Sequence, residues 1–337
     1  MDIRLGIIGT GRIAKRFVVA STEVGAVQIV CVYNPHRESA EMFATEQGIV
    51  DYTDQWTDFV GKIDAAYIAS PHGTHASYAE ELLKAGKHVL CEKPMCLQGE
   101  EATALYQMAE EKHCVLMEAV KTAYCPGFQA MMDVARSGKI GQIRDVEACF
   151  TKLTPTNLRE LTDVTYGGSV TELGSYVLLP IWKLLGIDYI DVTYQSIYAE
   201  NGVDTYTKLI FTYEDGMAMA KTGLGVKSEG QLLISGTKGY ILCKAPWWLT
   251  KKFEVRYEDP NKREVYEYPY EGAGLQYELE AFKRKICDQL MDAISLKSDD
   301  ERNTVFAGLS RAESIASATV MGYYLKDQEK RRKITDG

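Results

Sequence analysis

The first third of the chain alternates short apolar runs with helical stretches, and this alternation constrains the fold more than any other feature. Apolar runs occur at RLGIIG, QIVCVYN, DAAYIAS, HVLCEK and CVLMEA, with helical patterns between them. Buried strands joined through helices form βαβ units, a parallel sheet and right-handed connections. We therefore predict that residues 1–123 form a doubly wound α/β domain.

The pattern changes after about residue 124. Pro126 opens a helix, and strand-like runs separated by turns then dominate as far as residue 268. Two helices are predicted at 275–297 and 302–327. We expect residues 124–337 to form an α+β domain with an open, largely antiparallel sheet. Its apolar strand residues, with Trp247 and Trp248 among them, predict a sheet face that pairs with a second copy of the chain.

Charge and composition exclude several classes of protein. The chain has 38 Lys and Arg residues against 47 Asp and Glu, a net charge of −9, which disfavours nucleic acids and anionic membranes as partners. The apolar runs are too short for a membrane span, and the first residues lack a signal peptide. The 8 cysteines show no C-x-x-C spacing, which suits a reducing compartment. We expect a cytoplasmic protein.

A glycine-rich turn follows the first predicted strand and opens the first predicted helix. Its spacing is Gly-x-Gly-x-x-Ala, at Gly9, Gly11 and Ala14. The first glycine permits a tight turn, the second lets the backbone approach a pyrophosphate, and the helix N-terminus attracts the anion. The alternative is a purely structural turn in another α/β fold. The residues predicted to bind a dinucleotide here are Gly9, Thr10, Gly11, Arg12 and Ile13.

The end of the second predicted strand indicates which nicotinamide cofactor binds. Asn34 stands where an acidic residue would bind the ribose hydroxyls of NAD. Without that carboxylate nothing repels the 2′-phosphate of NADP, and Arg37 can pair with it. Alternatively, Arg37 begins the next helix from solvent. We predict Asn34 and Arg37 in the cofactor site, with NADP preferred over NAD.

Two further loops follow predicted strands, at the edge where parallel sheets bind ligands. The residues predicted to border the cofactor are Ser70, Pro71, His72 and His75 in the first loop, and Glu92 and Lys93 in the second. A lysine in this position can stabilise a developing alkoxide, so Lys93 is a candidate catalytic residue, or else a surface lysine before a proline. The two histidines have no third ligand cluster, so we predict no metal site. His75 alternatively has a capping and loop role.

In the second domain, Glu172 and Tyr176 lie four residues apart in a predicted helix and therefore share one face. A carboxylate beside a phenol can handle a proton when a cation assists, and Lys93 is a candidate for that cation. The alternative is an ordinary amphipathic face. All 5 histidines lie in the first half of the chain, which favours Tyr176 as the acid or base.

Taken together, these motifs resemble the glucose–fructose oxidoreductase/inositol dehydrogenase/MocA family. The resemblance rests on four segments in that family's order and spacing: Gly9–Ala14, Pro71-His72, Glu92-Lys93-Pro94 and Gly167–Tyr176. Within the family the chain is most similar to the dimeric dihydrodiol dehydrogenase branch. The resemblance implies an N-terminal Rossmann domain that binds the cofactor, and a C-terminal domain that binds substrate and forms oligomers.

The resemblance also implies an enzyme, an NAD(P)-dependent dehydrogenase or reductase that acts on CH–OH groups of a sugar, polyol or diol. Lys93 and Tyr176 would be the catalytic pair, with Glu172 orienting them, in a homodimer or larger homo-oligomer. Two rival functions are a non-catalytic regulator that senses the cofactor, and a glycoside-cleaving relative that retains NAD. Further candidates for substrate contacts are Lys121, Asn157 and Arg159.

Overall fold

The computed structural model describes residues 2–294 and 308–335, and it divides the chain into two compact units. The first unit comprises Met1–Tyr124 and Glu271–Ser314, and the second comprises Cys125–Tyr270 and Ile315–Gly337. The sequence predicts a single boundary at 123/124, and the structure divides the chain differently. Helix α9 (Leu275–Ile294) belongs to the first unit because it packs against α1 (Arg12–Ser21), β5 (His88–Glu92) and the short η2 helix (Lys121–Tyr124).

The first unit contains a six-stranded parallel sheet in the order β3-β2-β1-β4-β5-β6. This is the predicted doubly wound sheet, and the five predicted strands are confirmed. The strands besides β5 are β1 (Ile3–Ile8), β2 (Val27–Tyr33), β3 (Tyr52–Thr53), β4 (Ala65–Ile68) and β6 (Leu116–Ala119). The sequence analysis missed β3, which is too short to show a periodic pattern.

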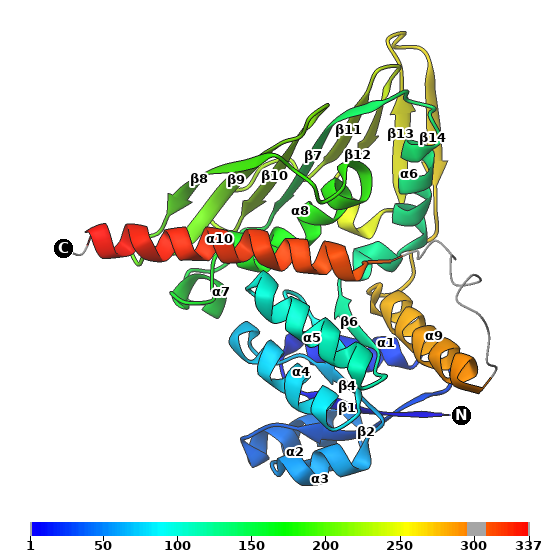
Figure 1. The fold of residues 1–337 in the computed structure, drawn as a ribbon, viewed down its shortest axis with the longest axis vertical. Coiled ribbons are helices and arrows are strands. Elements are labelled where there is room, and N and C mark those ends of the chain that lie inside the picture. Colours follow the sequence, from blue (N-terminus) through cyan, green and yellow to red (C-terminus); the bar gives the residue numbers. More distant parts are fainter. Residues whose placement is uncertain (1, 295–307, 336–337) are drawn as a thin grey trace. The chain divides into compact units, whose positions relative to one another are not determined.

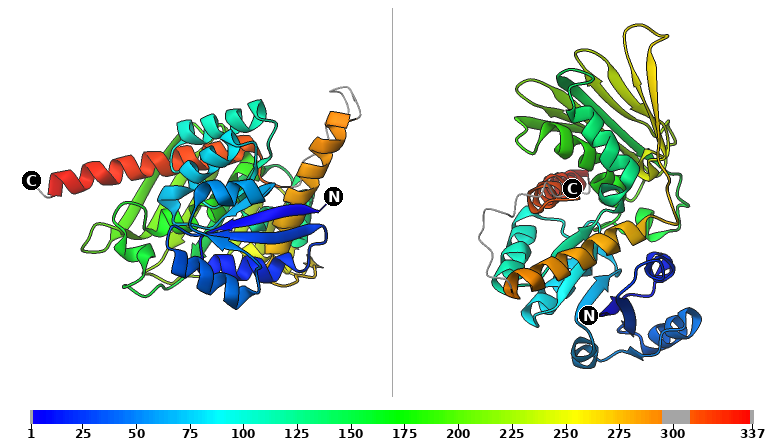
Figure 2. Two further views of the ribbon diagram at one scale, coloured as in Figure 1. Left: turned by 90° about the horizontal axis from the view of Figure 1, so that it is seen from below. Right: turned by 90° about the vertical axis from the view of Figure 1, so that its right-hand side faces the viewer.

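Helices cover both faces of this sheet (Figure 2). Besides α1 and α9 they are α2 (Arg37–Gln47), α3 (Trp56–Lys62), η1 (His72–Thr74), α4 (His75–Lys84) and α5 (Gly99–Glu111). Strand β4 is buried along its whole length, as expected for a central strand of a parallel sheet. The polar loops therefore lie at the ends of the strands, where the sequence places the candidate site.

The second unit contains an eight-stranded sheet in the order β14-β13-β12-β11-β7-β10-β9-β8 (Figure 1). Only the β7–β10 pair is parallel, so the prediction of a largely antiparallel sheet is confirmed. The strands are β7 (Ile143–Thr151), β8 (Asp191–Tyr198), β9 (Asp204–Thr212), β10 (Met217–Gly223), β11 (Leu232–Gly236), β12 (Tyr240–Cys243), β13 (Lys252–Arg256) and β14 (Arg263–Glu267).

Helices of the second unit pack on one face of this sheet (Figure 2). They include α6 (Pro126–Arg136), α7 (Arg159–Thr162), α8 (Ser169–Leu185), η3 (Trp247–Leu249) and α10 (Arg311–Thr335). Helix α10 begins at Arg311 in the described part of the chain. Residues 302–307 of one predicted helix and 295–297 of the other lie outside the described residues. Ser310 and Glu313 form a reciprocal capping box, because each side chain accepts a hydrogen bond from the other's backbone N–H.

Burial alternates along the strands, which gives this sheet one covered and one open face. In β9, Leu209 and Phe211 are buried, whereas the intervening Ile210 is 47% exposed. The expectation that Trp247 contributes to the open face is wrong. Trp247 is fully buried and donates a hydrogen bond from Nε1 to the Cys149 carbonyl at 2.8 Å.

Candidate functional site

The glycine turn after β1 leaves the N-terminus of α1 open. Gly9 has φ +97°, and a Cβ there would lie 2.6 Å from the Ala69 carbonyl oxygen, so only glycine fits. A Cβ at Gly11 would meet nothing within 4 Å. The N-cap residue, Gly11, has no side chain to cap the helix, whose first N–H groups lack intrahelical partners. This polar, unobstructed terminus fits the pyrophosphate of a dinucleotide, and Thr10, Arg12 and Ile13 adjoin it.

The end of β2 forms a hydrogen-bonded turn beside the glycine loop. The Asn34 amide donates to Thr10 Oγ1 at 2.9 Å, and Asn34 Oδ1 accepts from the His36 backbone N–H at 2.9 Å. These bonds tie the two predicted cofactor loops together. Arg37 has another partner in this structure, since its guanidinium pairs with Asp54 at 3.4 Å and lies 5.3 Å from the Tyr52 ring centroid.

The loop after β4 is joined to the Lys93 loop through one buried histidine. His75 is 1% exposed, and its Nδ1 and Nε2 lie 2.9 Å and 2.8 Å from the carbonyl oxygens of Pro94 and Ser70. Carbonyl oxygens only accept hydrogen bonds, so satisfying both contacts takes an imidazolium with two N–H donors. Pro71 begins the turn, and His72 is buried with its ring centroid 5.6 Å from that of His75.

Glu92 and Lys93 end β5 in a largely buried polar environment. Glu92 Oε1 accepts a hydrogen bond from the Tyr67 hydroxyl at 2.6 Å, and Oε2 accepts one from the Lys93 backbone N–H at 3.2 Å. Burial raises the pKa of Glu92, while Lys93 and the Tyr67 hydroxyl oppose that rise. Lys93 itself is half-buried. The arrangement holds the lysine beside a hydrogen-bonded carboxyl group.

Lys121, a predicted substrate contact, forms a hydrogen bond within the first unit. Its side chain is only 7% exposed, and Nζ donates a hydrogen bond to the Ala273 carbonyl at 2.6 Å. That carbonyl lies just before α9. The lysine therefore ties the returning segment of the chain to the end of β6.

Helix α8 brings Glu172 and Tyr176 together as the sequence predicts. All residues from Ser169 to Trp182 are buried except Glu172 and Tyr176, which are half-buried. A helix that is apolar almost all round is a core helix. Two polar side chains one turn apart on its single accessible face can together contact a ligand.

A buried carboxylate holds the start of α8. Asp204 Oδ2 accepts hydrogen bonds from the backbone N–H groups of Ser169 and Val170 at 2.9 and 3.2 Å, and from the hydroxyls of Ser169 and Thr207 at 2.5 and 3.0 Å. A Cβ at Gly168, where φ is +113°, would collide with the same carboxylate. Asp204 thus acts as a cap supplied from β9, and the sequence analysis missed it.

Two predicted substrate contacts lie on the segment before α8. Arg159 Nη2 donates to Glu172 Oε1 at 3.1 Å, so the arginine holds the carboxylate on the accessible face of α8. Asn157 is exposed on the turn before α7. The structure therefore joins Arg159 to the predicted site and leaves Asn157 at the surface.

An aromatic wall stands beside Tyr176. The Phe150 ring lies 5.3 Å from the Tyr176 ring in an edge-on arrangement, and Trp248 stacks on Phe150 at 3.6 Å. Trp248 is half-buried and adjoins Gly230, where a Cβ would lie 3.2 Å from its ring. The wall joins β7, α8 and η3, and no local pattern in the sequence links those three segments.

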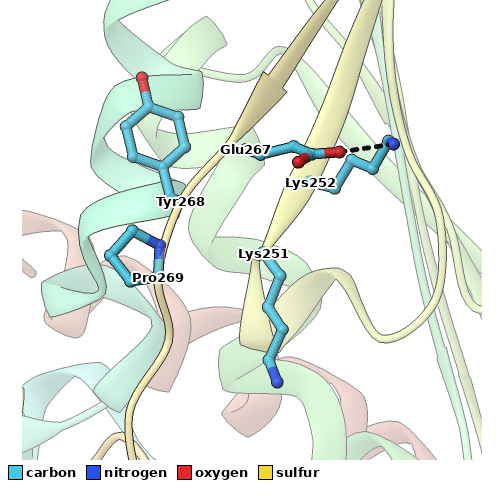
Figure 3. A pocket seen from close by; sticks show the side chains of 5 residues that line it. All are labelled: Lys251, Lys252, Glu267, Tyr268 and Pro269. Atoms are coloured by element: carbon cyan, nitrogen blue, oxygen red, sulfur yellow. Dashed lines mark hydrogen bonds and ion pairs between the residues drawn. The ribbon is translucent and has the colours of Figure 1, made fainter.

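Two surface hollows in the second unit lie away from Tyr176. The larger, about 470 Å³, lies on β13 and β14 and is lined by Lys251, Lys252, Glu267, Tyr268 and Pro269 (Figure 3). In Figure 3 Lys252 pairs with Glu267, while Lys251 points away from them. The side chains do not converge on one point. The smaller, about 280 Å³, is lined by apolar and tyrosine side chains of β8 and α10.

Within residues 2–294 and 308–335, no three His, Cys, Asp or Glu side chains gather in a way that could hold a metal ion. Among the helices of the same described segments, none combines the length and apolar composition that a bilayer span requires.

The chain belongs to the GFO/IDH/MocA family of oxidoreductases. Residues 3–120 match the family's NAD-binding Rossmann fold, and residues 128–242 match its C-terminal domain. The resemblance stated from the motifs is thereby confirmed. The chain is an NAD(P)-binding oxidoreductase by family.

Relatives extend over nearly the whole chain. The scyllo-inositol 2-dehydrogenase (NADP(+)) IolU of Bacillus subtilis is 28% identical over 94% of this chain and 96% of its own length. The trans-1,2-dihydrobenzene-1,2-diol dehydrogenase of Xenopus laevis is 26% identical over 87% and 92%. The solved 3-ketoreductase KijD10 from Actinomadura kijaniata, a complex with NADP and TDP-benzene, has the same fold, with TM-score 0.78 and 20% identity over 95% and 96% of the two chains.

Proposed function

We propose that this protein transfers a hydride between NADP(H) and a carbinol or carbonyl carbon of a sugar, polyol or diol. The observation that carries the proposal is the accessible face of α8, where Glu172 and Tyr176 are half-buried in a stretch, residues 169–182, that is otherwise buried. The relatives named above are named for an inositol, a dihydrobenzene diol and a keto group, which share that reacting carbon.

The cofactor is held at the N-terminus of α1. Gly9 and Gly11 leave room for the pyrophosphate, and the first N–H groups of the helix bind it. Asn34 places no carboxylate near the ribose, and Arg37 supplies a positive charge for the 2′-phosphate of NADP. When bound, the nicotinamide gives or takes the hydride.

Side chains of this protein handle the proton. Tyr176 accepts the proton of the substrate hydroxyl in oxidation and returns it in reduction. Lys93 stabilises the negative charge that develops on oxygen, and Glu172, oriented by Arg159, binds a neighbouring hydroxyl. Phe150 and Trp248 contact the apolar face of the substrate ring.

A hydride-transfer assay over a substrate panel tests this function. The purified protein is given NADP⁺ or NADPH with scyllo-inositol, other cyclic polyols, sugars, diols and the matching ketones, and absorbance of the reduced nicotinamide is followed. We expect turnover of at least one polyol or ketone, and loss of that turnover in Tyr176→Phe. The matched control is Tyr323→Phe, an exposed tyrosine on α10, which should keep wild-type activity. Wild-type activity in Tyr176→Phe would contradict the assignment.

The open face of the eight-stranded sheet suits self-association. Four side chains of its strands are large, apolar and exposed, namely Ile197 at 55%, Ile210 at 47%, Met217 at 60% and Val265 at 46%. An apolar face of this kind is favoured as an interface between identical chains. We propose a homodimer or larger assembly through this face. Light scattering should give a multimeric mass for the wild type and a lower mass for Ile210→Glu, and a wild-type monomer at micromolar concentration would contradict it.

A further inference from the structure

Glu278 is a fully buried carboxyl group in the first turn of α9. It is 0% exposed, and neither of its oxygens has a hydrogen-bond partner among the residues that the structure describes. Most buried polar atoms are paired, because an unpaired one loses its hydration without compensation. Glu278 is therefore an exception that calls for a physical explanation.

Three ionisable side chains face this carboxyl group, all within the first unit. Glu92 comes from the end of β5, and Lys121 and Tyr124 come from η2. Glu92 in turn faces Lys93, the candidate catalytic lysine, and Glu118 on β6. The site of Lys93 thus has a second layer of charged groups behind it, and Glu278 is its most deeply buried member.

The two neighbouring carboxyl groups, Glu92 and Glu278, differ in their hydrogen-bond donors. Glu92 receives one hydrogen bond from the Tyr67 hydroxyl and one from the Lys93 backbone N–H. Glu278 receives none from the described part of the chain. A negative charge is stabilised where donors point at it, so it resides on Glu92.

The charge balance supports the same assignment. Burial, followed by repulsion from Glu92, raises the pKa of Glu278 well above its ordinary value, and Lys121 opposes the rise only in part. With Glu92 and Glu118 ionised and Glu278 neutral, the two lysines balance the two carboxylates of the group. Ionising Glu278 as well would add one uncompensated negative charge.

We propose that Glu278 is a positioning residue that keeps a proton behind Glu92, so that the group behind Lys93 carries one negative charge fewer. This inference rests on the proposed function, in which the positive charge of Lys93 stabilises negative charge developing on substrate oxygen. When alkaline pH removes the proton from Glu278, the added negative charge offsets part of that stabilisation and carbonyl reduction slows. Glu278 thereby sets the alkaline limit of the reaction without touching the substrate.

Glu278→Gln tests the idea because an amide copies the shape of a neutral carboxylic acid and cannot ionise. The matched control is Glu280→Gln in the same helix, an exposed carboxylate that pairs with Lys283. Carbonyl reduction with NADPH is measured from neutral to alkaline pH. For Glu278→Gln we expect a rate within about twofold of wild type at neutral pH, and an alkaline limb of kcat/KM displaced upward by at least about half a pH unit. If the alkaline limb of kcat/KM is the same in Glu278→Gln and wild type, Glu278 has no positioning role.

The dependence of Tm on pH tests whether Glu278 is protonated, and this measurement needs no substrate. A carboxyl group whose pKa is raised by folding stabilises the fold below its ordinary value of 4.5, and that stability is lost as the pH rises toward the folded value. The Tm of Glu278→Gln should therefore rise relative to wild type from about pH 5 upward, while Glu280→Gln shows no such trend. If Glu278→Gln is less stable than wild type at neutral pH, the assignment of a neutral, protonated Glu278 is wrong. This measurement stands even if the proposed activity is not found.

Discussion

Helices α1 and α8 both begin directly after a glycine, but their N-termini have different surroundings. At α1, Gly11 leaves open space and, as the N-cap residue, has no side chain to cap the N-terminus. At α8, Gly168 makes room for Asp204, whose carboxylate takes up the first N–H groups. The comparison teaches that a glycine before a helix does not by itself mark an anion site. What occupies the terminus decides between binding a ligand and fixing the helix.

The largest expected effect comes from filling the open terminus. Gly11→Asp places a carboxylate at the N-terminus of α1, where nothing lies within 4 Å of a new Cβ, so the fold should tolerate it. Repulsion of the pyrophosphate should weaken NADPH binding by at least ~100-fold. Fluorescence titration with NADPH measures this. Gly25→Asp, at an equally open glycine beyond the other end of α1, is the control, and equal affinities for both variants would remove α1 from the cofactor site.

Opening the closed terminus should have a different consequence. Asp204→Ala removes a carboxylate that accepts three hydrogen bonds from the start of α8 and one from Thr207, at a cost of about 2–4 kcal/mol, because the buried donors are left unpaired. Thermal unfolding should show a Tm lower by roughly 5 °C or more, with NADPH affinity unchanged. Asp191→Ala, at an exposed aspartate on β8, provides the reference. A Tm equal to that of the reference would contradict the cap.

A smaller effect should come from the rim of the open terminus. Arg37 is shared between Asp54 and the proposed 2′-phosphate site, so Arg37→Ala should weaken NADPH binding roughly threefold to tenfold and leave NADH unchanged. Asp54→Asn frees the guanidinium and should strengthen NADPH binding. Competitive titration with both cofactors separates the two changes. If Arg37→Ala leaves the affinity for NADPH unaltered, the arginine has no part in cofactor choice.

The sequence predicted features whose causes are local. The parallel sheet followed from alternating apolar runs, and the α8 pair followed from the spacing of Glu172 and Tyr176. Features with distant partners escaped prediction. Asp204 lies far along the chain from Ser169, and α9 leaves the second half of the chain to pack in the first unit. No short-range pattern records such contacts, because they form only when the sheet places the segments together.

One local signal was readable and was missed. Ser310 and Glu313 have the spacing of a capping box, which predicts that α10 begins at Arg311. A capping box defines where a helix begins better than apolar periodicity does, because its side chains accept hydrogen bonds from backbone N–H groups at one fixed position.

The central proposal is that Lys93 and Tyr176 act on one proton. Single-turnover hydride transfer tests it most directly, measured for wild type, Tyr176→Phe, Lys93→Met and the double variant at saturating NADPH and ketone. Each single variant should be slower by roughly 10²–10⁴-fold, with NADPH affinity nearly intact. The double variant should be little slower than the slower single, because the two residues work as one unit. A double variant whose loss is the product of the two single losses, or a Tyr176→Phe protein that keeps most of its rate, would contradict the account.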